Sequence, residues 1–118
     1  LGLAGIKLGW VEGVGGPRSP IAADADGVDL CRALGPDVVV LVADAGLGTI
    51  NAVVLSCQPY QALGHEPLVV LNRFDDGEDL HRRNAGWLRD RVGLPVLTSP
   101  AALAHRLGTG LRPAGADP

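Results

Sequence analysis

Short apolar stretches alternate with longer segments of mixed polarity along the 118-residue chain. Four of these stretches are rich in branched apolar residues, which is typical of β-strands: residues 8–12 (LGWVE), 37–44 (DVVVLVAD), 67–72 (PLVVLN) and 94–99 (LPVLTS). The segments between them are long enough to hold helices. The pattern therefore predicts strands that alternate with helices.

Three segments combine apolar residues at helical spacing with start and stop signals: residues 24–35, 49–64 and 79–93. In the first of them, either Asp24 or Asp26 can serve as the N-cap, because both carboxylates can accept the free N–H groups of a first helical turn. Gly35 stands where this helix is expected to stop.

The second and third helices have similar signals. Thr49 is a candidate cap, Gly64 a stop, and Pro59 is expected to bend or end the regular part of the second helix. The third helix is expected to cap on Asp79 and to stop at Gly93. Its large apolar residues are expected on one side: Leu80, Trp87 and Leu88.

Strands joined by helices of this length must run parallel, because each connection crosses back over the sheet. The strands are apolar on both faces, which favours helices on both sides of the sheet. The predicted fold is an α/β protein with a doubly wound, mostly parallel sheet. We expect residues 1–107 to form one domain and residues 108–118 to form a flexible tail.

Composition narrows the class of protein further. With 47% hydrophobic residues and a net charge of −3, the chain is expected to be a soluble globular domain and not a nucleic-acid binder. Its longest apolar run is far too short to span a membrane, and we expect a cytoplasmic protein. Cys31 and Cys57 each fall within a helical pattern and are predicted to be small core residues.

Polar residues follow each predicted strand. They are Glu12, Asp44, Asn72, and Thr98 with Ser99. In open parallel sheets, ligands bind beyond the carboxyl ends of the strands. For any single position, an ordinary turn is the alternative interpretation, because polar residues are common where strands end. The whole set of polar residues favours a ligand site at this edge.

Glu12 lies directly before a glycine-rich turn. A carboxylate at a strand end is a suitable ligand for Mg²⁺, which prefers oxygen donors. Gly13, Gly15 and Gly16 would let a phosphate lie against backbone N–H groups. A structural turn with Glu12 capping a neighbouring loop is an equally good interpretation of the residues themselves.

A second glycine-bearing turn leads into the helix at residues 49–64. Gly48 and Thr49 would offer an anion site at the positive end of this helix, and Asn51 projects from the same first turn. An ordinary N-cap is the alternative. The helix is apolar on more than one side, which favours a subunit interface on its second face.

Four motifs together resemble the carboxyl-terminal half of dethiobiotin synthases: VEGVGGPRSPI, VADAGLGTINAVVLS, VVLNRF and HRRNAGWLRDRVGLPVLTSP. This family has a P-loop NTPase fold. The resemblance implies ATP- and Mg²⁺-dependent ring closure of 7,8-diaminononanoate with CO₂, in biotin biosynthesis. The match extends to about Pro100.

The resemblance also implies roles for individual residues. Glu12 would bind Mg²⁺, and the nucleotide would contact Glu12, Gly13, Val14, Gly15, Asn72, Arg73, Ser99, Pro100 and Ala101. The last three would form a loop that closes over the base. Gly48, Thr49 and Asn51 would hold the substrate carboxylate, offered across a homodimer whose interface is the helix at residues 49–63.

The 118 residues contain no G-x-x-x-x-G-K-[ST] motif, and Lys7 is the only lysine. Because phosphoryl transfer depends on such a loop, the chain as given is not expected to catalyse the reaction. The chain could be part of a dethiobiotin synthase, a non-catalytic interaction or nucleotide-sensing module, or a member of a related P-loop family. His65, His81 and His105 are expected at the surface, without a metal cluster.

Overall fold

The structure is a computed structural model, and it describes residues 8–110. Its elements follow one another in an α/β order that matches the predicted alternation for most of the chain. They are β1 (Pro20–Ala22), β2 (Ala25–Asp26), α1 (Gly27–Leu34), β3 (Val40–Asp44), α2 (Thr49–Ala62), β4 (Leu68–Asn72), α3 (Asp79–Trp87), a π-helical turn η1 (Leu88–Val92), β5 (Val96–Leu97) and α4 (Pro100–Gly110).

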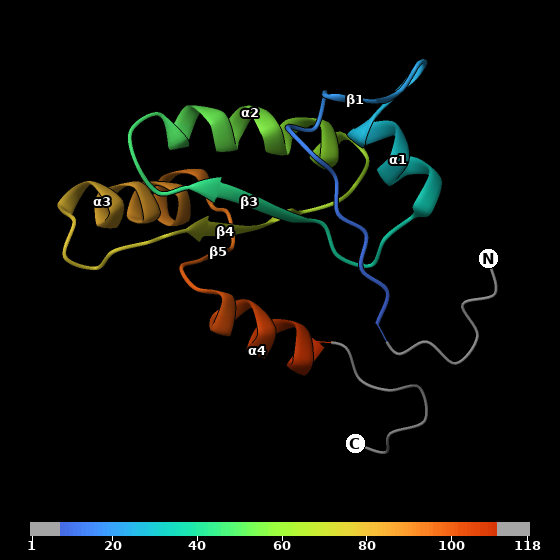
Figure 1. Cartoon of the computed structure of the whole chain (residues 1–118). Helices are drawn as coiled ribbons and strands as arrows, with labels where there is room; N and C mark the ends of the chain where they lie inside the picture. The colour runs from blue at the N-terminus through green and yellow to red at the C-terminus, as the bar shows by residue number, and fades with distance from the viewer. Residues whose placement is uncertain (1–7, 111–118) are drawn as a thin grey trace.

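The main sheet has the order β3-β4-β5, and both pairs of strands are parallel. β3 and β4 pair along their whole length, from Val40 opposite Leu68 to Asp44 opposite Asn72. The parallel α/β arrangement predicted from the sequence is therefore confirmed. Figure 1 shows that the strands end on the side where α2 begins.

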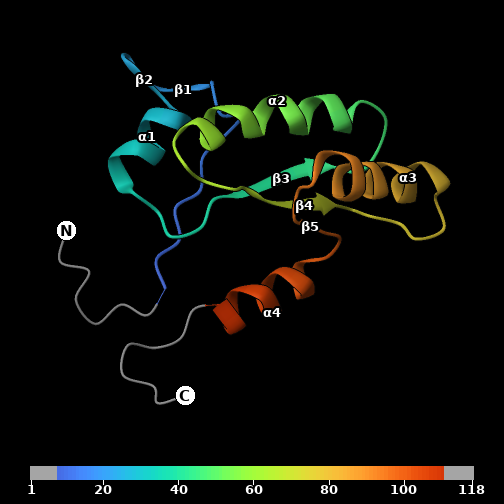
Figure 2. The same cartoon turned by 180° about the vertical axis from the view of Figure 1, so that it is seen from behind.

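Helices lie on both faces of this sheet. α2 covers one face, whereas α4 lies on the other, in Figure 1 and in the reverse view of Figure 2. Side chains alternate between the faces of β4, and Val69 and Leu71 point into a core shared with α2 and α3. This core is completed by Ala45, Val53, Cys57, Ala85, Leu88, Leu94 and Val96.

α1 begins and ends as predicted. Asp26 is the N-cap, and Asp26 and Asp29 form a capping box in which each side chain accepts the other residue's backbone N–H. Gly35 ends the helix in the left-handed region, with φ of 58°. Both predicted cysteines are core residues, since Cys31 and Cys57 are free and buried.

Two details of α2 differ from the prediction. Gly48, not Thr49, is the N-cap, because its φ of 90° suits glycine and leaves Thr49 as the first helical residue. α2 also runs past Pro59 to Ala62, so the proline does not end it.

In the third predicted helix, only part of the apolar side is buried. Leu88 is buried, but Leu80 and Trp87 are exposed. α3 begins after Glu78 as N-cap, and the π-helical turn shifts the phase of the helix before Gly93 ends it. The residues that pack inward are therefore Asn84, Ala85 and Leu88.

The predicted strand at residues 8–12 is wrong. These residues have no regular structure and are exposed, because no strand lies beside them among residues 8–110 to supply ladder hydrogen bonds. Glu12 therefore does not follow a strand. The small antiparallel pair β1-β2, which follows the glycine-rich turn, was not predicted either.

The predicted loop at Ser99, Pro100 and Ala101 is also wrong. Ser99 caps α4, because its Oγ accepts the N–H of Ala102 at 3.1 Å, and Pro100 occupies the first helical position, which suits its missing N–H. α4 continues to Gly110, so helical backbone extends beyond the boundary expected after Leu107. The rest of the expected tail, residues 111–118, lies outside the described residues.

Candidate functional site

Two strands of the main sheet end in polar residues at one edge. Asp44 and Asn72 are register partners at the last positions of β3 and β4, and both are exposed. β5 ends at the apolar Leu97, which pairs with Val70, and Ser99 follows outside the strand. The structure thus brings the predicted polar strand ends of residues 44 and 72 together, whereas residue 99 belongs to the start of α4.

The loop from β3 to α2 lies at the same edge. Gly46 approaches Asp44 so closely that a Cβ on it would lie 3.1 Å from Asp44 Oδ2. The loop closes through a hydrogen bond from the N–H of Thr49 to the carbonyl of Gly46, at 3.3 Å. α2 has no side-chain cap, so N–H groups of its first turn remain available to a ligand.

Thr49 carries an unusual polar atom. The residue is only 4% exposed, and its Oγ1 is the one buried side-chain polar atom among residues 8–110 that has no hydrogen-bond partner. A buried hydroxyl left unpaired costs about 1–3 kcal/mol. Its place at the uncapped, positive end of α2 is compatible with a bound anion that would accept its hydrogen.

Asn84 connects this loop to α3. Its Nδ2 donates to the carbonyls of Ala45 and Gly46, both at 2.9 Å, and the side chain is buried. Sequence reasoning missed this residue. The available signal was an asparagine inside a helix, where its own propensity is poor and a specific hydrogen-bonding role is the usual explanation.

The glycine-rich turn is internally bonded. Gly15 has φ of 84°, and a Cβ there would lie 2.6 Å from Ser19 Oγ. The N–H of Gly16 donates to this same hydroxyl at 3.0 Å, and the N–H of Ser19 donates to the carbonyl of Gly16 at 3.0 Å. The N–H of Gly16 is therefore engaged within the turn and not free for a phosphate.

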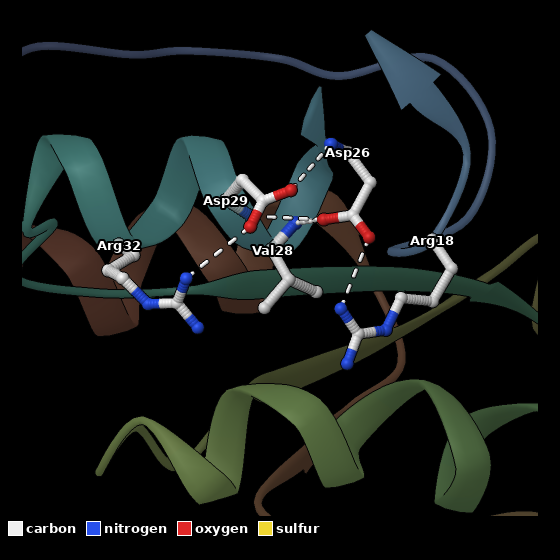
Figure 3. A network of polar contacts seen from close by, with 5 residues as sticks. All are labelled: Arg18, Asp26, Val28, Asp29 and Arg32. Atoms are coloured by element: carbon white, nitrogen blue, oxygen red, sulfur yellow. Dashed lines mark hydrogen bonds and ion pairs between the residues drawn. The ribbon is translucent and has the colours of Figure 1, made fainter. Parts of the chain in front are cut away.

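Polar contacts fasten this turn to α1, as Figure 3 shows. Arg18 forms an ion pair with Asp26 at 3.1 Å, while the other oxygen of Asp26 accepts the N–H groups of Val28 and Asp29. Arg32 pairs in turn with Asp29 at 3.4 Å. The Asp29 N–H in particular, with help from Arg18, lowers the pKa of the Asp26 carboxyl.

The turn lies beside the second half of α2, not at its start. Gly16–Pro20 and the α2 residues Leu55, Ser56 and Pro59 line an open groove of about 490 Å³. Leu55 is six residues beyond Thr49, which corresponds to roughly 9 Å along a helix. The structure does not bring the glycine-rich turn to the edge formed by the strand ends.

Arg73 directly follows β4 and adopts a left-handed conformation, with φ of 55°. This conformation turns the chain into the loop before α3. His81 holds the loop, since its Nδ1 accepts the N–H of Asp75 at 3.0 Å and its ring lies 5.8 Å from that of Phe74. The polar residues Asn72 and Arg73 are both exposed at the strand-end edge.

Neither a clustered metal site nor a membrane span is present in the part of the chain that the structure describes. No group of three or more His, Cys, Asp or Glu side chains there could hold a metal ion. Glu12 is exposed and offers a single carboxylate, which is compatible with Mg²⁺ bound mainly by phosphates and water. None of the helices between residues 8 and 110 has the length and apolar character needed to cross a bilayer.

The fold and the strand-end edge define an α/β protein with a candidate ligand site beyond a parallel sheet. Comparison with known proteins narrows the class of protein. Over about three quarters of its length, the chain is similar to part of ATP-dependent dethiobiotin synthetase BioD. The resemblance found in the four sequence motifs is thus confirmed as a partial match.

The protein of Haloferax mediterranei is 39% identical over 97 residues, which cover 78% of this chain and 40% of that protein. The proteins of Clostridium botulinum (strain ATCC 19397) and Xanthomonas euvesicatoria are 34% and 38% identical, over 75% and 72% of this chain. The chain spans about 40% of the length of these curated relatives. No family model and no solved structure matches it.

Proposed function

We propose that this chain forms the carboxyl-terminal part of a dethiobiotin synthetase with a P-loop NTPase-like, doubly wound sheet. The reaction is the ATP- and Mg²⁺-dependent ring closure of 7,8-diaminononanoate with CO₂. One observation carries the proposal: a chain similar to dethiobiotin synthetases has a buried hydroxyl without a partner, that of Thr49, at the uncapped start of α2.

The start of α2 suits a carboxylate in three ways. The hydroxyl of Thr49 can donate one hydrogen bond, and the free N–H groups around Asn51 can donate others. The dipole of a helix adds about 0.3–1 kcal/mol of attraction for a negative charge at its start. Gly48 permits the left-handed turn from which α2 begins. The substrate carboxylate therefore binds at Gly48, Thr49 and Asn51.

The nucleotide would lie along the strand-end edge. Asn72 and Arg73 contact the adenine, and the start of α4 at Ser99, Pro100 and Ala101, which follows β5 after Leu97, closes over the base. Because Ser99 Oγ already caps α4, backbone groups are the better contacts there. Glu12 supplies one oxygen to Mg²⁺, and Gly13, Val14 and Gly15 lie beside the phosphates. This contact requires the glycine-rich turn to approach the strand-end edge from its place beside the second half of α2.

α2 would form the interface of a homodimer. Leu55 on this helix is 56% exposed, and the groove at Pro59 and the glycine-rich turn leaves apolar surface uncovered. A symmetric contact through α2 would bury this surface and place the substrate carboxylate of one subunit beside the nucleotide of the other.

A non-catalytic nucleotide-sensing or interaction module is the second candidate. The 118 residues contain no P-loop motif and a single lysine, Lys7, which is consistent with either candidate. For either candidate, we expect this chain alone to bind Mg-ATP weakly or not at all, as measured by calorimetry, because phosphates depend on a P-loop for most of their contacts. A dissociation constant of a few micromolar would contradict this.

Calorimetric titration tests the carboxylate site. We expect 7,8-diaminononanoate to bind more tightly than octane-2,3-diamine, which keeps both amines and lacks the carboxylate. In the variant Thr49→Val, which keeps the shape of the side chain, this preference should fall by a factor on the order of tenfold, because one hydrogen bond to a charged group is lost. Equal binding of both diamines, or no binding of either, would overturn the proposal.

A further inference from the structure

Asn84 is the buried polar link between α3 and the loop that opens α2. It is 6% exposed, and a single amide nitrogen donates to two consecutive carbonyls, those of Ala45 and Gly46. The two bonded residues lie 39 and 38 positions away in the chain. A side chain that uses both of its N–H donors on adjacent peptide groups fixes the orientation of both.

This arrangement sets the polarity of the loop. Carbonyl groups carry negative partial charge and would repel a carboxylate. Because the carbonyls of Ala45 and Gly46 point to Asn84 inside the protein, they are held away from the ligand side. The carbonyl of Gly46 also accepts the N–H of Thr49 at 3.3 Å, so the same peptide group that Asn84 holds also anchors the first residue of α2.

We infer that Asn84 is a positioning residue for carboxylate recognition. It acts through the loop from Ala45 to Thr49, by holding the carbonyl oxygens of Ala45 and Gly46 away from the ligand and by fixing the position of Thr49 at the start of α2. The role in ligand recognition rests on the proposed carboxylate site, whereas the effect of Asn84 on the loop can be measured without any ligand.

The test uses the whole chain with the substitution Asn84→Asp, which has nearly the same shape but no N–H donors at neutral pH. Arg89→Met is the matched control. Arg89 also ties the helical segment to a strand, since its Nε and Nη2 donate to the carbonyl of Val96 at 3.2 and 2.9 Å, and neither hydrogen bond involves the loop from Ala45 to Thr49. Asn84→Ser, which adds no charge to the core, is used with the same criteria if Asn84→Asp does not fold.

Two measurements are made on each folded variant. The first is the amide hydrogen exchange rate of the Thr49 N–H. We expect this rate to rise at least about tenfold in Asn84→Asp, because losing a buried hydrogen bond destabilises the closed loop by a corresponding free energy. The rate should not change in Arg89→Met. Calorimetry should show a similar loss of affinity for 7,8-diaminononanoate, with binding of octane-2,3-diamine unchanged.

The outcomes separate the two proposals. Unchanged exchange of the Thr49 N–H in the Asn84 variant, or an equal change in Arg89→Met, would overturn the positioning role. Equal loss of affinity for both diamines would overturn it as well, because a general loss of structure does not discriminate between ligands. If the unsubstituted chain binds neither diamine, the proposed carboxylate site fails, while the exchange data still decide whether Asn84 orients the loop.

Discussion

Asp44 and Asn72 stand directly opposite each other at the last paired positions of β3 and β4. One carries a negative charge and the other a neutral amide, and both are exposed at the edge where α2 begins. Because Asn72 is uncharged, the carboxylate of Asp44 can lie close to Gly46 without electrostatic repulsion from β4. The strand-end edge therefore combines one charge with several uncharged hydrogen-bonding groups.

The substitution Asn72→Asp would place two carboxylates at neighbouring positions of the sheet. We expect it to lower the free energy of unfolding by about 0.2–1 kcal/mol near neutral pH, because like charges directly opposite each other repel. The loss should shrink at about 1 M salt, which screens exposed charges. Chemical unfolding at low and at high salt measures it, with Asn72→Gln as the neutral control. A loss that is equal at both salt concentrations would show that charge is not the cause.

Much of the fold follows from local sequence signals. The branched apolar runs predicted β3 and β4. Only β4 has the burial expected of a strand covered on both faces, since β3 is an edge strand of the described sheet and its Val42 is exposed. The ends of α1 at Asp26 and Gly35 were predictable from capping chemistry, which involves only residues a few positions apart. Polar residues at the ends of parallel strands also predicted the shared edge of Asp44 and Asn72.

The features that depend on distant partners were not predictable in the same way. Residues 8–12 have the composition of a strand, but a strand also needs a neighbouring strand, and local composition does not supply one. Asn84 meets Ala45 across 39 positions of sequence. The start of α4 is different, because its signals are local. The serine cap at Ser99 and the proline at the first helical position indicate a helix, but the family resemblance led us to expect a loop there.

The capping box of α1 should make stability depend on pH. The pKa of Asp26 is lowered in the folded protein, so its contribution is present above its usual value of 3.8 and is lost as the pH falls through the lowered pKa. An asparagine side chain at this position would still accept the same N–H groups, so the substitution Asp26→Asn should lower the melting temperature at about pH 7 and lower it less at about pH 2.5. Circular dichroism melts test this, and a gap that does not narrow in acid would contradict it.

Cys57 should limit stability in alkali. Burial, with a smaller effect of the Glu66 charge, raises the pKa of its thiol from 9.0 to about 11. The stabilising contribution is therefore complete below pH 9.0 and is lost as the pH rises through about 11, because only the unfolded chain ionises easily there. Unfolding free energies in this range should fall more steeply for the unsubstituted chain than for Cys57→Val. Parallel curves for the two proteins would exclude this role.

Self-association is expected through α2. Leu55 is exposed on this helix beside the groove at Pro59, and its apolar surface favours contact with a second copy of the chain. The substitution Leu55→Asp should weaken association by at least about tenfold in sedimentation velocity experiments, because a buried charge opposes the contact. Leu34→Asp, at an exposed leucine of α1, is the control and should have little effect. A monodisperse monomer at high concentration would argue against the interface.

The most direct test of the account is to locate the ligand on the labelled chain by two-dimensional amide NMR. Titration with 7,8-diaminononanoate should shift the resonances of Gly48, Thr49 and Asn51 at the start of α2, and octane-2,3-diamine should leave them in place. Shifts confined to other parts of the chain, the same shifts with both diamines, or no shifts at all would contradict a carboxylate site at this helix.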